Sequence, residues 1–147
     1  KQYPVILNKE HNIYGFVNGD SKQKVTILHF DVDNLSSKRK TKSPYEISSL
    51  MFKLYSLMSE FFLDRKSMAF FMGGDNFMVV ANDDAKEMAK EFIERTKKDL
   101  SILLNCGIGI GKTSREAAKL ATQSLDKIRE IRDSGKEKPE IVETSCF

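Results

Sequence analysis

The stretch that decides the fold is Phe70-Phe71-Met72-Gly73-Gly74-Asp75-Asn76-Phe77-Met78, near the middle of this 147-residue chain. Two apolar segments flank a turn of two glycines, an aspartate and an asparagine, which is typical of a β-hairpin. A two-residue hairpin needs fewer polar residues than this turn contains. The turn therefore either satisfies its own backbone or presents Asp75 and Asn76 for chemistry.

Hydrophobic periodicity on both sides of the hairpin predicts further strands and helices. Helices are expected where apolar residues recur at spacings of three and four, and strands where short β-prone apolar runs occur. In chain order, the expected elements are strand Val25–Phe30, a helix that Ser43 caps and Pro44 begins, strands Met68–Met72 and Phe77–Ala81, a helix from Asn82 or Asp83 to about Leu100, strand Ser101–Ile110, a helix from Thr113 or Ser114 to about Asp133, and a short strand Glu140–Val142. This order predicts an α+β, ferredoxin-like βαββαβ core, with an antiparallel sheet covered by helices on one face.

Length and composition indicate one globular domain, expected over residues 24–147, preceded by a hairpin or arm over residues 1–23. Hydrophobic residues make up 40% of the chain and charged residues 31%, which excludes a disordered chain. No apolar run is long enough for a membrane span, and no secretory signal is expected at the start. Cys106 and Cys146 lack metal-binding spacing, so a reducing compartment and a cytoplasmic protein are predicted.

The net charge is +3, and four of the cations lie in the segment Ser36–Lys42. This segment is either a solvated loop or a rim that attracts phosphate groups near an active site. A long nucleic acid would need a broader basic stripe, so none is expected as a partner.

Carboxylates follow the first predicted strand of the core, at Asp31 and Asp33. They are turn formers, or they face one side of the sheet together if the strand continues that far. In the split βαβ order the first and third core strands are neighbours, so the hairpin should deliver Asp75 next to Asp31. Such a pair, with the Val32 carbonyl, suits Mg²⁺ or Mn²⁺, and two such ions can activate an attacking oxygen and stabilise a leaving pyrophosphate.

Glycines alternate with isoleucines in Gly107-Ile108-Gly109-Ile110-Gly111, followed by Lys112 and Thr113. A phosphate loop would need a glycine where Cys106 stands. The alternation instead predicts a strand with one flat glycine face, which could accept a base or ribose. The last helix carries Lys127, Arg129 and Arg132, either on a solvated face or as a phosphate ligand.

The two histidines, His11 and His29, show no ligand spacing, and His29 is expected to be a satisfied buried histidine. No combination of serine, cysteine, histidine and aspartate indicates a nucleophilic hydrolase.

Together these segments resemble the palm superfamily, which includes GGDEF-type diguanylate cyclases, GTP cyclohydrolase III and the CRISPR polymerase palms. The resemblance covers about residues 24–135 and includes Glu116-Ala117 after the glycine-rich strand. The hairpin motif Gly-Gly-Asp-Asn-Phe is that of GTP cyclohydrolase III, whose chains carry two palm units. A single palm is more similar to the minimal CRISPR polymerases.

The resemblance implies that Asp31, Val32 and Asp75 bind the metal ions, and that Asp31, Asp75 and Asp33 are catalytic. The expected substrate site comprises Asn34, Gly73, Gly74, Asn76, Lys112, Lys127 and Arg129. The resemblance places Arg129 near the family's phosphate-binding lysine. Asn76 departs from the second acid of the GGDEF form, which favours the cyclohydrolase.

Three functions follow as hypotheses. The first is a nucleotidyl cyclase that makes a cyclic oligonucleotide signal from a nucleoside triphosphate, expected to be ATP, in antiviral defence. The second is opening of the GTP imidazole ring, as in GTP cyclohydrolase III. The third is a nucleotide-binding palm without activity. The single palm also predicts a homodimer with nucleotide near its interface.

Overall fold

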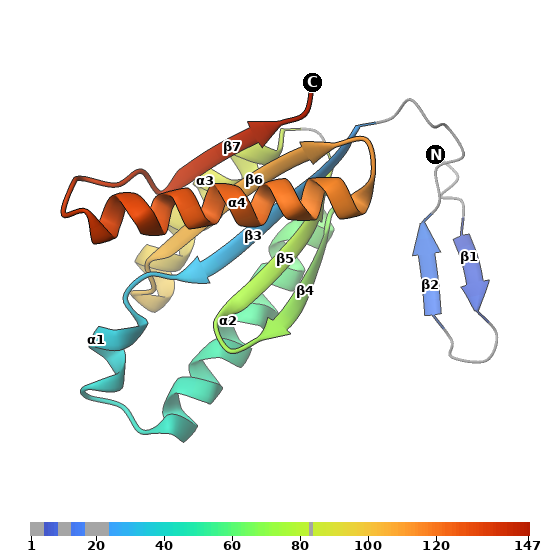
Figure 1. The fold of residues 1–147 in the computed structure, drawn as a ribbon. Helices are drawn as coiled ribbons and strands as arrows, with labels where there is room; N and C mark the ends of the chain where they lie inside the picture. Colours follow the sequence, from blue (N-terminus) through green and yellow to red (C-terminus); the bar gives the residue numbers. More distant parts are fainter. Residues whose placement is uncertain (1–4, 9–12, 17–23, 83) are drawn as a thin grey trace.

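The structure is a computed structural model that describes residues 5–8, 13–16, 24–82 and 84–147. Five strands form one sheet in the order β4-β5-β3-β6-β7 (Figure 1). The elements of this unit are β3 (Val25–Val32), α1 (Leu35–Arg39), α2 (Pro44–Asp64), β4 (Met68–Gly73), β5 (Asn76–Ala81), α3 (Ala85–Leu100), β6 (Leu104–Gly111), α4 (Ser114–Asp133) and β7 (Ile141–Ser145). The predicted βαββαβ core is confirmed as β3-α2-β4-β5-α3-β6, with β3 antiparallel to both β5 and β6. At the edge, β7 pairs parallel to β6.

The first two strands, β1 (Val5–Asn8) and β2 (Ile13–Phe16), pair antiparallel in a separate two-stranded sheet. They lie within residues 1–23, the segment predicted to form a hairpin or an arm. The rest of residues 1–23 lies outside the described ranges.

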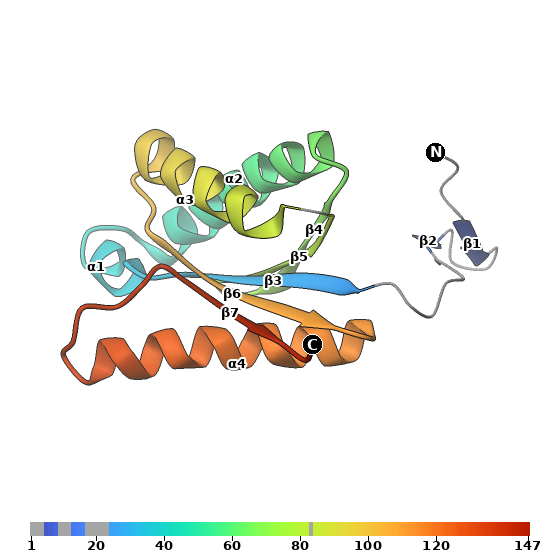
Figure 2. The same cartoon turned by 90° about the horizontal axis from the view of Figure 1, so that it is seen from above.

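Helices cover both faces of the five-stranded sheet, since α4 lies opposite α2 and α3 (Figure 2). The sequence predicts helices on one face of the sheet. Helices α2 and α3 do share one face, but α4 lies on the other. The cause is the glycine face of β6, where an added Cβ at Gly107 or Gly109 would overlap the α4 backbone at Ala121 or Ala117. The expected use of this face for a base or ribose is therefore wrong, because α4 fills it.

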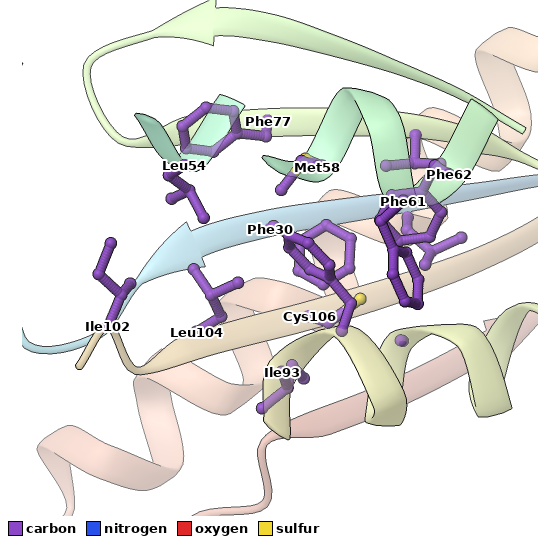
Figure 3. Packing of buried hydrophobic residues seen from close by; sticks show 14 of the residues in the cluster. Phe30, Leu54, Met58, Phe61, Phe62, Phe77, Ile93, Ile102, Leu104 and Cys106 are labelled. Carbon is purple, nitrogen blue, oxygen red and sulfur yellow. The ribbon is translucent and has the colours of Figure 1, made fainter. Parts of the chain in front are cut away.

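The main core lies between the sheet and the pair α2 and α3 (Figure 3). Phe30 is fully buried there, with its ring centroid 5.9 Å from that of Phe62 and 5.8 Å from that of Phe92. Because side chains alternate along a strand, burying Phe30 on this face turns His29 and Asp31 toward α4. The core therefore sets the direction of the polar residues at the end of β3.

Local differences from the predicted boundaries are small. The basic segment expected as a loop begins with the short helix α1. The capping box of α2 is present, with Ser43 and Glu46 exchanging hydrogen bonds. Helix α3 begins after Asp84 rather than after Asn82 or Asp83. Within the described ranges, no helix combines the length and the apolar character that crossing a membrane would need.

Candidate active site

The turn between β4 and β5 lies beside the end of β3. Phe30 is paired with Phe77, so the next residue of β5 toward the turn, Asn76, is level with Asp31. Gly73 and Gly74 have φ values of 95° and 61°, which favour glycine at both positions. The strand pairing thus places the Gly-Gly-Asp-Asn turn beside Asp31, as the sequence predicts.

Asp31 is almost completely buried, and one of its carboxylate oxygens accepts two hydrogen bonds from a single arginine. Its Oδ2 accepts hydrogen bonds from Arg129 Nε (3.0 Å) and Nη2 (2.8 Å), and its Oδ1 accepts one from Asn105 Nδ2 (3.0 Å). Burial acts to lower the pKa of Arg129, but the hydrogen bonds and charge of Asp31 outweigh it, so the pKa is raised. The contact holds α4 against the end of β3.

Asp33 lies in a second cluster beside the first. Asn105 Nδ2 donates to its Oδ1 (3.1 Å), Lys138 Nζ lies 3.2 Å from its Oδ2, and Arg132 Nη1 lies 3.5 Å from its Oδ1. Burial acts to raise the pKa of Asp33, but the bonds from Asn105 and Lys138 outweigh it, and the pKa is lowered. Arg129, Arg132 and Lys138 thus gather at this strand end, where Asp126 and Asp133 also contact the two arginines. Cations of these types can bind phosphate oxygens.

This lowered pKa predicts a pH dependence of stability. Because the folded pKa of Asp33 is below its unfolded value, its contribution is present above the unfolded value and is lost as the pH falls through the folded one. We expect the difference in unfolding free energy between wild type and Asp33→Asn to shrink between about pH 6 and about pH 3, from a starting value of about 1 kcal/mol or less. Urea unfolding measures it, with Asp99→Asn, which removes the exposed partner of Arg95, as the control. A difference that grows toward low pH would contradict the assignment.

His29 links the turn to α4. Its Nε2 lies 3.0 Å from Asn76 Oδ1 and its Nδ1 lies 3.0 Å from Thr122 Oγ1. Burial is the main cause that lowers the pKa of His29. Asn76 Nδ2 in turn donates to Asp75 Oδ1 at 3.4 Å. His29 is a satisfied buried histidine, as expected from the sequence, and its partners belong to the candidate site.

Three of the residues predicted to bind substrate make their contacts away from the clusters around Asp31 and Asp33. Lys112 follows Gly111, which pairs with Val25 at the start of β3, so it lies about 20 Å along the strand from Asp31. Lys127 Nζ donates to Thr144 Oγ1 of β7. The Asn34 side chain bonds the backbone at Ser101 and Leu103, next to the start of β6.

An open pocket of about 480 Å³ lies between α1, α2 and the turn. Its walls are mostly apolar, two cations line it, and Gly74 connects it to the turn that carries Asp75. The lining residues are Leu35, Arg39, Lys42, Pro44, Ile47, Ser48, Met51, Phe52, Phe71 and Gly74. Periodicity predicts Ile47 and Met51 as core residues of α2, and only the fold shows that they border a pocket.

The carboxylates predicted to bind a metal ion are those of Asp31 and Asp75, beside the end of β3. Among the described residues, no group of three or more histidine, cysteine, aspartate or glutamate side chains lies close enough to hold a metal. Mg²⁺ does not require such a cage, because it commonly binds one or two carboxylates and completes its shell with water and substrate phosphates. The carboxylates of Asp31 and Asp75 offer hard oxygen ligands of this kind, and Arg129 would have to share Asp31 Oδ2 or release it.

Comparison with known proteins identifies a family and several relatives. The family model described as GTP cyclohydrolase III matches residues 8–144. GTP cyclohydrolase III of Methanocaldococcus jannaschii is 35% identical over 106 residues, which are 71% of this chain and 40% of that protein. The Saccharolobus solfataricus protein of the same name is 31% identical over 112 residues, 76% of this chain and 46% of its own. The chain thus spans about half the length of these relatives.

Solved structures show the same fold. An EAL/GGDEF domain protein from M. capsulatus has a TM-score of 0.65 at 16% identity, covering 86% of this chain and 88% of that one. The active GGEEF domain of a diguanylate cyclase from Vibrio cholerae has a TM-score of 0.60 at 13% identity, covering 86% and 85%. At this identity the likeness confirms the palm fold alone. The family match and the sequence identity establish that the chain belongs to the GTP cyclohydrolase III family.

Proposed function

We propose that this chain binds GTP and opens its imidazole ring, the activity for which its family is named. The observation that carries the proposal is the position of the Gly-Gly-Asp-Asn turn. Gly74 lines the pocket, and the neighbouring Asp75 lies one residue before Asn76, which the strand pairing sets level with Asp31. A base in the pocket and a triphosphate at the cations of α4 would bridge these two features.

The pocket suits a purine base. Phe52, Phe71 and Met51 offer apolar surface for the ring faces, and Arg39 and Lys42 can donate hydrogen bonds to ring nitrogen and carbonyl oxygen acceptors. The basic segment of the sequence therefore contributes two cations to the pocket, which supports its interpretation as part of a site rather than as a solvated loop.

The carboxylates of Asp31 and Asp75, with the Val32 carbonyl, would hold Mg²⁺ or Mn²⁺, which supplies charge stabilisation to the phosphates and a more acidic bound water. Arg129 and Arg132 face the same strand end and can bind phosphate oxygens. Ring opening adds one water to guanine, its oxygen to C8 and a proton to N7. The C8–N9 bond then breaks as the hydroxyl proton moves to N9, which leaves a formamide on N7.

A nucleotidyl cyclase is the second candidate function, and the fold it shares with GGDEF domains supports it. In that reaction a ribose hydroxyl attacks the α-phosphorus of another nucleotide and pyrophosphate leaves. Asn76, which stands where the GGDEF form has an acid, cannot accept the hydroxyl proton as a carboxylate would. The family match favours the cyclohydrolase over the cyclase. The single palm predicts the opposite preference.

The test is incubation with Mg²⁺ or Mn²⁺ and either GTP or ATP, with products identified by mass spectrometry. We expect a formamidopyrimidine from GTP and no such product from Asp75→Ala. A cyclic or linear oligonucleotide with pyrophosphate would establish the cyclase instead. A wild-type protein that binds Mg²⁺–GTP without turnover would leave the third hypothesis, a binding palm.

A homodimer is proposed from the exposed apolar surface of β4 and β5. Phe70, Met72 and Val80 are 42%, 57% and 45% exposed, beyond the cover that α4 provides. A second copy would remove this surface from water. We expect light scattering to give a dimer mass that Phe70→Glu converts to a monomer, while Leu63→Glu on α2, also exposed, leaves it unchanged. A monomeric wild type with activity linear in enzyme concentration would refute the dimer.

A further inference from the structure

His29 lies in the middle of β3 with 8% of its surface exposed, and both ring nitrogens have partners on other elements. Thr122 belongs to α4 and Asn76 begins β5. Both hydrogen bonds are between side chains. The ring therefore connects α4 with β5, two elements that are not paired with each other in the sheet. Sequence reasoning assigns this ring only a structural role.

The direction of each hydrogen bond follows from the chemistry of the groups. A carboxamide oxygen only accepts, so His29 Nε2 carries the proton in its bond to Asn76 Oδ1. The other amide atom, Asn76 Nδ2, is thereby turned toward Asp75 Oδ1, 3.4 Å away. With Nε2 protonated, the neutral ring leaves Nδ1 as the acceptor of the Thr122 hydroxyl. The chain of donors runs from Thr122 through His29 and Asn76 to Asp75.

We propose that His29, anchored by Thr122, is a positioning residue that fixes the Asn76 carboxamide and through it the Asp75 carboxylate. This role rests on the proposed function, in which Asp75 binds the metal ion. The Asn76 amide could otherwise rotate by half a turn and present its oxygen to Asp75, which would repel that carboxylate. The anchor is rigid because the glycine face of β6 holds α4 close to the sheet.

Paired substitutions separate positioning from packing. His29→Leu removes the donor, whereas His29→Gln retains an N–H near the position of Nε2. Thr122→Val removes the hydroxyl at nearly constant volume, and Thr122→Ser retains it. We expect His29→Leu to lower kcat by about 10- to 100-fold with little change in KM, as for other groups that orient a ligand residue. Partial rescue by His29→Gln and near-complete rescue by Thr122→Ser are expected, at unchanged melting temperatures within each pair.

A second readout needs no nucleotide. The side-chain amide signals of Asn76, assigned by their loss in Asn76→Ala, report its orientation in ¹⁵N NMR spectra of the free protein. We expect both signals to shift in His29→Leu and to return toward wild-type positions in His29→Gln. Thr122→Val should shift them less.

The outcomes distinguish this inference from the proposed function. Amide signals that depend on His29 in a protein without turnover support the positioning role and overturn the activity. An active wild type whose Asn76 signals and kcat are unaffected by His29→Leu overturns the positioning role and leaves the activity standing. Equal losses of kcat in His29→Leu and His29→Gln also overturn it, because packing rather than the N–H would then matter.

Discussion

Gly109→Ala is expected to destabilise the protein by about 3 kcal/mol or more, near the upper end of the cost of overpacking. The added Cβ would overlap the Ala117 carbonyl oxygen and the Ala121 amide nitrogen, which are backbone atoms of α4. A helix backbone cannot rotate away as a flexible side chain can, so α4 as a whole has to shift from β6. That shift would also disturb the contacts of Thr122 and Arg129. Urea unfolding of both proteins measures the loss.

The matched control is Gly135→Ala, the same chemical change just after α4. Gly135 has a φ of 76° and open space around the position of a Cβ. Its substitution should cost only the penalty of left-handed backbone, about 1–2 kcal/mol. Equal losses for the two variants would show that α4 does not lie against the glycine face.

The order of the core elements is predictable from the sequence because each element has a strong local pattern. The apolar residues of α2 recur at helical spacing, and Ser43, Pro44 and Glu46 mark its start. The glycine alternation in β6 also predicts a flat face correctly, but a flat face accepts either a ligand or a helix. The small residues Ala117 and Ala121 on α4 decide between the two. Their packing against Gly109 and Gly107 is a property of the assembled fold that local periodicity does not contain.

The candidate site is predictable to a lesser degree. The meeting of Asp31 with the Gly-Gly-Asp-Asn turn follows from strand order, because the first and third core strands pair. Asn105, which bonds both Asp31 and Asp33, is 74 residues from Asp31. Its signal is a single polar residue inside the apolar run Ile102–Ile110. Lys138 follows α4 in a polar segment without any pattern, and only the fold brings it to Asp33.

Asp31→Asn is expected to reduce turnover of GTP by roughly 10³-fold, which corresponds to about 4 kcal/mol of transition-state stabilisation. Asparagine retains the volume of the side chain and an oxygen that can accept from Asn105 or Arg129. It removes the negative charge that a divalent cation requires. Mn²⁺ binding in the presence of GTP, measured by electron paramagnetic resonance, should weaken in parallel, while the fold is retained.

Asp126→Asn provides the matched control, because Asp126 contacts the same guanidinium. Arg129 Nη1 donates to Asp126 Oδ1 at 2.9 Å on the exposed side of α4, and Arg129 Nη2 lies 2.8 Å from buried Asp31 Oδ2. If Asp31 serves only to hold Arg129, both substitutions weaken that hold, and turnover should fall with the melting temperature in each. If Asp31 binds the metal ion, Asp126→Asn should change turnover by less than about threefold, as for an exposed ion pair. A large loss of turnover and of Mn²⁺ binding in Asp31→Asn alone would then assign the carboxylate to the metal rather than to the arginine.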